Sequence, residues 1–151
     1  MIIYVDADAS PVTQDIIDIA NTFKLHVRLI KSYAHYSDRF NSPLVEEIYV
    51  DSHNEAADYK IIQLIQPGDI LITQDYGLAS LVLPKGCQVI HPRGSIYKAE
   101  SINHLLESRY LNSQIRKQGG KTKGPSRFTE TERQAFILTL ENVIESELSE
   151  R

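Results

Sequence analysis

The chain has 151 residues, a net charge of −4 and a single cysteine, Cys87, so it cannot form an internal disulfide bond. A chain of this length buries about 70% of its unfolded surface, which is enough for one domain with its own core. No apolar run approaches the roughly 20 residues of a membrane-spanning helix, and no basic region precedes the apolar start. We therefore expect a cytoplasmic protein without membrane contact, in which Cys87 is a buried structural thiol.

Short apolar segments alternate with helical patterns along the first ninety residues. Residues 2–5 form a β-branched run that predicts a strand, and Ser10-Pro11 predicts a helix start with Ser at the N-cap. An apolar stripe at helical spacing continues this helix to Phe23. The same criteria predict strands at 25–30, 47–50, 69–73 and 87–90, and helices at 54–65 and 76–83. The order β-α-β-β-α-β-α-β predicts an α/β domain with a mainly parallel sheet covered on both faces.

The last third of the sequence has a different character. Residues 99–117 show helical periodicity, and residues 118–127 form a basic, glycine-rich linker. A second amphipathic helix follows, with Thr129 as its predicted N-cap and Glu132 three residues on. We therefore divide the chain into an α/β domain with a basic helix (1–117), a flexible linker (118–127) and a C-terminal amphipathic helix (128–151).

Charge is distributed unevenly along the chain. Residues 1–84 have a net charge of −7, residues 85–127 of +7 and residues 128–151 of −4. Such asymmetry is typical of proteins with a polyanionic partner, although a solvated helix face beside a linker would give the same pattern. Arg93, which follows the last predicted strand, is placed to bind a phosphate. The candidate nucleic-acid-binding residues are Arg93, Lys98, Arg116, Lys117, Lys121, Lys123 and Arg127.

Aspartates follow two of the predicted strands. Asp6 and Asp8 end the first strand, and Thr73 and Asp75 end the strand at 69–73. Because the carboxyl ends of parallel strands line one crevice, we expect these side chains to lie close together. Two carboxylates about 5 Å apart repel by roughly 3 kcal/mol, and Mg²⁺ or Mn²⁺ would remove that cost. Asp58, on the helix at 54–65, is a further candidate. The alternative role for Asp75 is a helix N-cap. For Asp6 and Asp8 the alternative is a solvated turn, and for Asp58 an ordinary position on a surface helix.

Several motifs occur in order from residue 2 to about residue 125. They are Val5-Asp6-Ala7-Asp8-Ala9-Ser10-Pro11-Val12, Ala57-Asp58, Pro67-Gly68-Asp69, Thr73-Gln74-Asp75-Tyr76-Gly77-Leu78-Ala79, Pro92-Arg93-Gly94 and Gly119-Gly120-Lys121-Thr122-Lys123-Gly124-Pro125. In these motifs the chain resembles the YaiI/YqxD family of small, largely uncharacterised bacterial proteins. Family members often have Cys where this chain has Ser10, so the family does not require a thiol there.

That family in turn resembles PIN-like nucleases, which have an Asp at the end of a strand, a helical Asp and a strand ending in Thr-x-Asp. Asp6, Asp58 and Asp75 match these positions in order. The resemblance implies a Rossmann-like three-layer fold and divalent-metal hydrolysis of RNA. Asp6, Asp58 and Asp75 would hold Mg²⁺ or Mn²⁺, with Asp8 bound directly or through water. Thr73 would orient the attacking water.

Two alternatives remain at this point. Asp-x-Asp after a first strand also occurs in phosphatases that form an aspartyl-phosphate, with Asp6 as nucleophile and Asp8 as general acid. Those enzymes need a downstream lysine, and Lys85 fits that order poorly. The other alternative is a non-catalytic RNA-binding or regulatory module that uses residues 85–127.

Overall fold

The computed structural model describes residues 1–8, 10–33, 42–52, 55–119 and 126–150, without the side chains of Arg109 and Arg116. Its centre is a five-stranded sheet in the order β3-β2-β1-β4-β5. Each strand pairs in parallel with its neighbours, so all five carboxyl ends lie at the same edge. The strands are β1 (Ile2–Asp6), β2 (His26–Ser32), β3 (Val45–Val50), β4 (Ile70–Ile72) and β5 (Gln88–Ile90).

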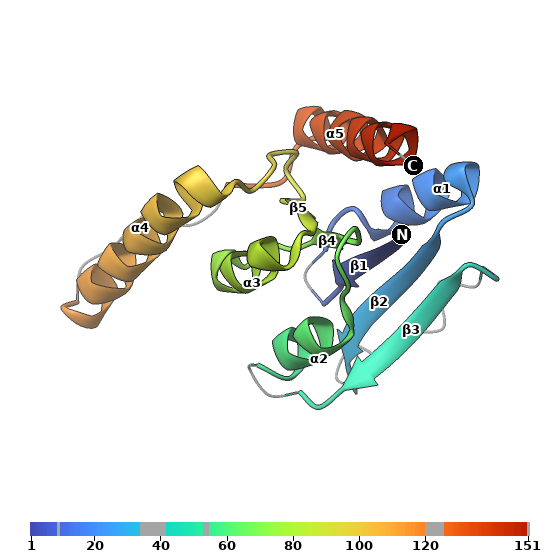
Figure 1. Ribbon diagram of the computed structural model, residues 1–151. Helices are drawn as coiled ribbons and strands as arrows, with labels where there is room; N and C mark the ends of the chain where they lie inside the picture. The colour runs from blue at the N-terminus through green and yellow to red at the C-terminus, as the bar shows by residue number, and fades with distance from the viewer. Residues whose placement is uncertain (9, 34–41, 53–54, 120–125, 151) are drawn as a thin grey trace.

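Helices separate most of the strands (Figure 1). They are α1 (Thr13–Phe23), α2 (Ala56–Leu64), α3 (Tyr76–Val82), α4 (Ala99–Lys117) and α5 (Glu130–Ser149), with a 3₁₀ turn at Leu83–Lys85 after α3. The element order over residues 2–90 is the predicted β-α-β-β-α-β-α-β. The α/β class with a mainly parallel sheet is therefore confirmed.

The side chains of each strand alternate between two hydrophobic clusters. In β1, Ile3 and Val5 join a cluster with residues of α1 and α5, whereas Tyr4 joins a cluster with residues of α2, α3 and the start of α4. In β4, Ile72 and Leu71 divide in the same way. The sheet is thus covered on both faces, which gives the Rossmann-like three-layer architecture expected from the resemblance.

Helix α1 begins two residues later than predicted. The Ser10 Oγ accepts a hydrogen bond from the Val12 N–H over 3.4 Å, as a capping residue would. The backbone of Val12 is nevertheless not helical, with φ −119° and ψ 14°, so the regular helix begins only at Thr13. Local hydrogen bonding at Ser10 therefore stabilises a turn that precedes the helix.

Helix α5 begins with the predicted capping box and forms part of the core. The Thr129 Oγ1 accepts the N–H of Glu132, and the Glu132 carboxylate accepts the N–H of Thr129. Phe136 and Leu140 are fully buried in the cluster that α5 shares with α1 and β1. The C-terminal extension thus provides a large part of one layer.

A glycine lets the loop after β5 approach α5 closely. Gly94 has φ +105°, and a Cβ there would lie 3.0 Å from the backbone of Ala135 and Phe136. The Gly94 carbonyl also accepts a hydrogen bond from the Thr139 hydroxyl over 2.7 Å. Glycine therefore allows both the backbone conformation and the contact at this position.

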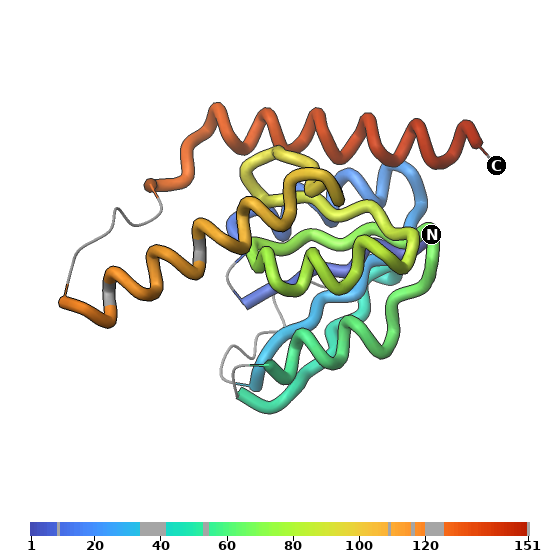
Figure 2. Tube along the Cα trace, turned by 60° about the vertical axis from the view of Figure 1, so that its left-hand side comes forward, coloured from blue at the N-terminus to red at the C-terminus, as the bar shows by residue number. Residues whose placement is uncertain are grey.

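Helix α4 packs on the body only near its start and then extends away from it (Figure 2). Ile102 is buried, whereas Tyr110, Leu111 and Ile115 in the second half are exposed. Among the described residues, no helix is long and apolar enough to cross a membrane.

Candidate active site

The register of the sheet brings Asp6 and Thr73 together. Val5 pairs with Ile72, so the next residues of β1 and of the segment after β4 lie side by side at the carboxyl edge. The Thr73 hydroxyl, on a side chain that is almost completely buried, donates to Asp6 Oδ2 over 3.0 Å. The predicted proximity of the two strand ends is therefore observed as a direct hydrogen bond.

Asp75 is joined to the same hydroxyl. Its backbone N–H donates to Thr73 Oγ1 over 3.0 Å, so one hydroxyl connects the carboxylate of Asp6 with the backbone of Asp75. Asp75 Oδ1 accepts the N–H groups of Gly77 and Leu78 over 2.8 and 3.2 Å, which makes Asp75 the N-cap of α3. This capping role fixes the carboxylate at the edge of the sheet.

Asp8 connects the end of β1 to the end of β2. Its Oδ1 and Oδ2 accept the Ser32 N–H over 2.9 and 3.1 Å. Burial raises the pKa of the Asp6 carboxyl group above its usual value, the Thr73 hydrogen bond lowers it, and the charges of Asp75 and Asp8 raise it further. Asp6 is thus close enough to Asp75 and to Asp8 for their charges to act on it, and burial has the largest effect on its pKa.

Asp58 lies in the first turn of α2 and is half-buried. Within the described parts of the chain, no three His, Cys, Asp or Glu side chains converge closely enough to hold a metal ion. The predicted set of Asp6, Asp8, Asp58 and Asp75 is therefore not assembled as a metal-binding group in this structure, and its metal-binding role stays a prediction.

Tyr97 supports the site in a way that sequence reasoning missed. Its hydroxyl donates to the Thr73 carbonyl over 3.1 Å, and its ring packs edge-on against Tyr76 with centroids 5.7 Å apart. Burial raises the pKa of Tyr97, which keeps the phenol protonated as a donor. Because the side chain is buried, Tyr97 offers no surface for a nucleobase to stack on.

Arg93 forms an ion pair with Glu132 of α5. Its Nη1 lies 2.7 Å from both carboxylate oxygens of Glu132 and 3.2 Å from Ser126 Oγ, and its guanidinium lies 5.9 Å from the Phe128 ring centroid. The hydrogen bond from Arg93 lowers the pKa of Glu132. A phosphate at Arg93 would therefore compete with Glu132 for the guanidinium.

The other predicted basic residues begin at Lys98, directly before α4, and continue along α4 and the segment that follows it. Lys98, Lys117 and Arg127 are exposed. Lys121, Lys123 and the side chain of Arg116 lie outside the part of the chain that the structure describes. Their contact with nucleic acid stays a prediction.

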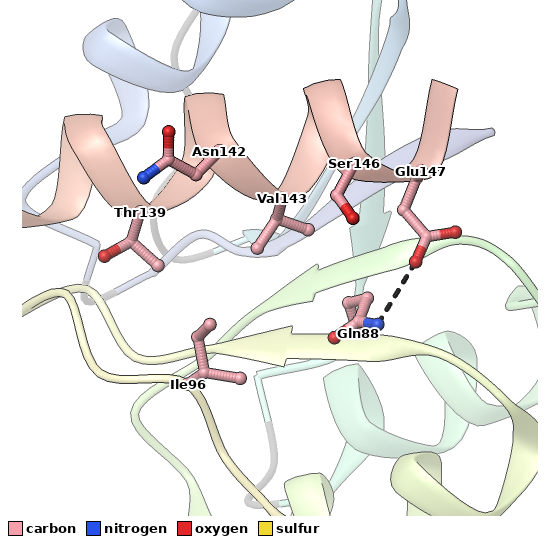
Figure 3. A pocket seen from close by; sticks show the side chains of 7 residues that line it. All are labelled: Gln88, Ile96, Thr139, Asn142, Val143, Ser146 and Glu147. Carbon is pink, nitrogen blue, oxygen red and sulfur yellow. Dashed lines mark hydrogen bonds between the residues drawn. The ribbon is translucent and has the colours of Figure 1, made fainter. Parts of the chain in front are cut away.

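A cavity of about 350 Å³ lies between α5 and β5, away from the aspartates (Figure 3). Gln88 begins β5, at the amino edge of the sheet, and its Nε2 donates to Glu147 Oε1 over 3.1 Å. None of the candidate aspartates lines this cavity. The residues that line it are Gln88, Ile96, Thr139, Asn142, Val143, Ser146 and Glu147.

Replacement of Thr73 by valine is expected to lower the free energy of unfolding by about 1.5 kcal/mol, because the Asp75 N–H loses its acceptor while side-chain volume is nearly conserved. Loss of the donor to Asp6 should also raise the pKa of Asp6 further. Urea unfolding of Thr73→Val beside Thr73→Ser, which keeps the hydroxyl, measures the effect. Equal stability of the valine variant and the wild type would mean that the hydroxyl does not hold the site together.

Comparison with known proteins identifies the family. A protein-family model described as "uncharacterized BCR, YaiI/YqxD family" matches residues 4–146 of the chain. A UPF0178 protein of Enterococcus faecalis is 49% identical over 148 residues, covering 98% of this chain and 100% of the relative. A UPF0178 protein of Bacillus cereus is 49% identical over 144 residues, covering 95% and 99%. No solved structure matches the chain. With a match over almost its whole length, the chain belongs to the YaiI/YqxD family.

Proposed function

We propose that this protein is a Mg²⁺- or Mn²⁺-dependent phosphodiesterase that cleaves RNA at the carboxyl edge of its sheet. The observation that supports this most directly is the unit formed by Asp6, Thr73 and Asp75, in which one buried hydroxyl holds two strand ends together. The pKa of Asp6 is raised by burial and by the charges of Asp75 and Asp8. A bound cation would stabilise the ionised form of a buried carboxylate that lies beside two other carboxylates.

The carboxylates at this edge of the sheet match the usual coordination of Mg²⁺ in proteins. Mg²⁺ is commonly held by one or two carboxylates together with waters and substrate phosphates, rather than by a complete cage of protein ligands. Asp6 and Asp75 would supply the two carboxylates, with Asp8 contributing through water. Asp58 would then take part only when substrate is present, in agreement with the lack of a three-residue group among the described residues.

A bound ion would lower the pKa of a water ligand and stabilise negative charge on the scissile phosphate. The neighbouring residues of the chain would orient the two carboxylates. Thr73 fixes Asp6 through its hydroxyl, and the first N–H groups of α3 fix Asp75. Tyr97 in turn holds the Thr73 carbonyl from the buried side. The carboxylates are therefore positioned before the ion or the substrate arrives, which reduces the ordering cost of binding.

RNA as the substrate is supported by charge. Residues 85–127 have a net charge of +7, and Lys98, Lys117 and Arg127 are exposed. Contacts of these side chains to phosphates would make the affinity fall steeply with salt. The same basic residues would serve a non-catalytic RNA-binding module, and an assay for RNA cleavage distinguishes the two functions.

The test is calorimetric titration of Mn²⁺ into the wild type and into the Asp6→Asn/Asp75→Asn double variant. We expect saturable binding that the double variant loses. Asp18→Asn, which changes an exposed aspartate of α1, is the matched control and should bind like the wild type. Single-stranded RNA of mixed sequence should be cleaved in Mn²⁺ by the wild type and the control only. If no Mn²⁺ binds even with RNA present, the phosphodiesterase proposal is wrong, and RNA binding without cleavage would favour the binding module.

A further inference from the structure

Three tyrosines surround a cavity at the carboxyl edge of the sheet. The cavity has a volume of about 370 Å³ and lies where β3 ends and α2 begins. Its size is within the range of pockets for small organic groups. The residues that line it are Tyr33, Tyr49, Val50, Asp51, Ala56, Tyr59, Lys60 and Gln63.

Two of these tyrosines expose most of their surface. Tyr33 stacks on Tyr49 with ring centroids 5.7 Å apart and an interplanar angle of 21°, yet Tyr33 is 62% exposed. Tyr59 is 63% exposed, and its hydroxyl donates to Glu55 Oε2 over 2.9 Å, which orients the phenol. The core does not require either ring, so burial does not explain why aromatic residues occupy these positions.

The cavity is close to the candidate active site in the fold. Tyr33 directly follows Ser32, whose N–H binds the Asp8 carboxylate. On α2, Tyr59 directly follows Asp58. Asp6 is level with Ile30 of β2, and Ile30 with Ile48 of β3, so Asp6 and Ile48 lie about 10 Å apart at the usual strand spacing. Strand β3 continues two residues farther, to Val50. Figure 1 shows the ends of β2 and β3 directed toward the side of the sheet where α2 begins.

We infer that this cavity is a stacking subsite for the bases of single-stranded RNA whose backbone crosses the Asp6–Asp75 edge. The inference rests on the proposed function and deepens it, because it selects single strands over duplexes. Bases within a duplex are already stacked and would not reach the tyrosine rings. Stacking on exposed aromatic rings is tolerant of base identity.

The polar residues that line the cavity suit a nucleotide. Lys60 supplies a positive charge for a phosphate, and Gln63 and Asp51 supply hydrogen-bonding groups for a base edge or a ribose hydroxyl.

Fluorescence anisotropy with a labelled single-stranded uridine decamer tests the subsite. The titration is made with Ca²⁺ in place of Mn²⁺, and a denaturing gel of the probe shows that it stays intact. Tyr33→Ala and Tyr59→Ala should each weaken binding by about five-fold or more, the effect of losing one base–aromatic stack. Tyr33→Phe and Tyr59→Phe keep the rings and should bind within about two-fold of the wild type. Leu138→Ala is the control, since Leu138 is 62% exposed on α5 and does not line the cavity.

An abasic decamer of the same length and charge should bind more weakly and should not distinguish the alanine variants from the wild type. The inference is overturned if the alanine variants bind the uridine decamer like the wild type, if the wild type does not bind it, or if Leu138→Ala causes an equal loss. Calorimetry with Mn²⁺ alone separates this result from the proposed function. Tyr33→Ala/Tyr59→Ala should bind Mn²⁺ normally, whereas Asp6→Asn/Asp75→Asn should not.

Discussion

Replacement of Phe136 by alanine is expected to lower the free energy of unfolding by about 3–5 kcal/mol. Phe136 is fully buried in the cluster that joins α5 to α1 and the central strands, so its loss leaves a cavity between two layers. Such a loss is a large part of the 5–15 kcal/mol that stabilises a typical domain. Urea denaturation followed by circular dichroism measures it.

Leu138→Ala is the matched control for this experiment. Leu138 lies on the same helix and is 62% exposed, so its truncation should change the stability by no more than about 0.5 kcal/mol. The pair also tests the predicted division of the chain at residues 118–127. If Phe136→Ala were as stable as Leu138→Ala, α5 would not belong to the cooperative unit formed by the sheet, and the chain would fold as two parts.

The order of strands and helices was predictable because each element has its own local signal. β1 and β4 are short β-branched runs that end at polar residues, and α5 begins with a capping box. The position of α5 in the fold was harder to predict from the sequence. Its spacing of buried residues shows that one side packs, but only the tertiary structure shows that this side contacts α1 and β1.

The site was predictable to the extent that it follows from strand ends. Parallel strands bring their carboxyl ends to one edge, and this principle alone predicts that Asp6 lies near Thr73. Contacts between residues far apart in the chain were not predictable in the same way. The bond from Tyr97 to Thr73 spans 24 residues, and the pairing of Arg93 with Glu132 spans 39. Neither has a local pattern that would reveal it.

Asp58 marks the limit of prediction from motif order. A match in sequence order shows only that the residues occur in the expected elements, whereas a metal site also requires their side chains to converge. Here α2 places Asp58 in its first turn, and the described residues contain no convergent three-ligand group. The role of Asp58 is therefore best tested with substrate present, by comparing RNA cleavage by Asp58→Asn with Mn²⁺ binding in the absence of RNA.

Asp6→Asn should have opposite effects on stability without and with metal. The raised pKa of Asp6 means that its protonated form favours folding, so stability is lost as the pH rises from the ordinary value of 3.8 through the raised one. At neutral pH the ionised carboxylate is therefore a cost in the metal-free protein. Its removal should raise the free energy of unfolding by about 1 kcal/mol, which corresponds to an increase of about 2–4 °C in the melting temperature.

Mn²⁺ at one hundred times its dissociation constant should stabilise the wild type by about 2.7 kcal/mol, or about 5–10 °C in melting temperature. Asp6→Asn should gain nothing from the ion, because it lacks the carboxylate that the ion would neutralise. Asp18→Asn should melt like the wild type under both conditions, since its exposed carboxylate lies on α1. Thermal melts at pH 7 with and without Mn²⁺ measure both effects. An Asp6→Asn variant that is less stable than the metal-free wild type would assign Asp6 a structural role, because a residue kept for binding an ion is expected to cost stability in its absence.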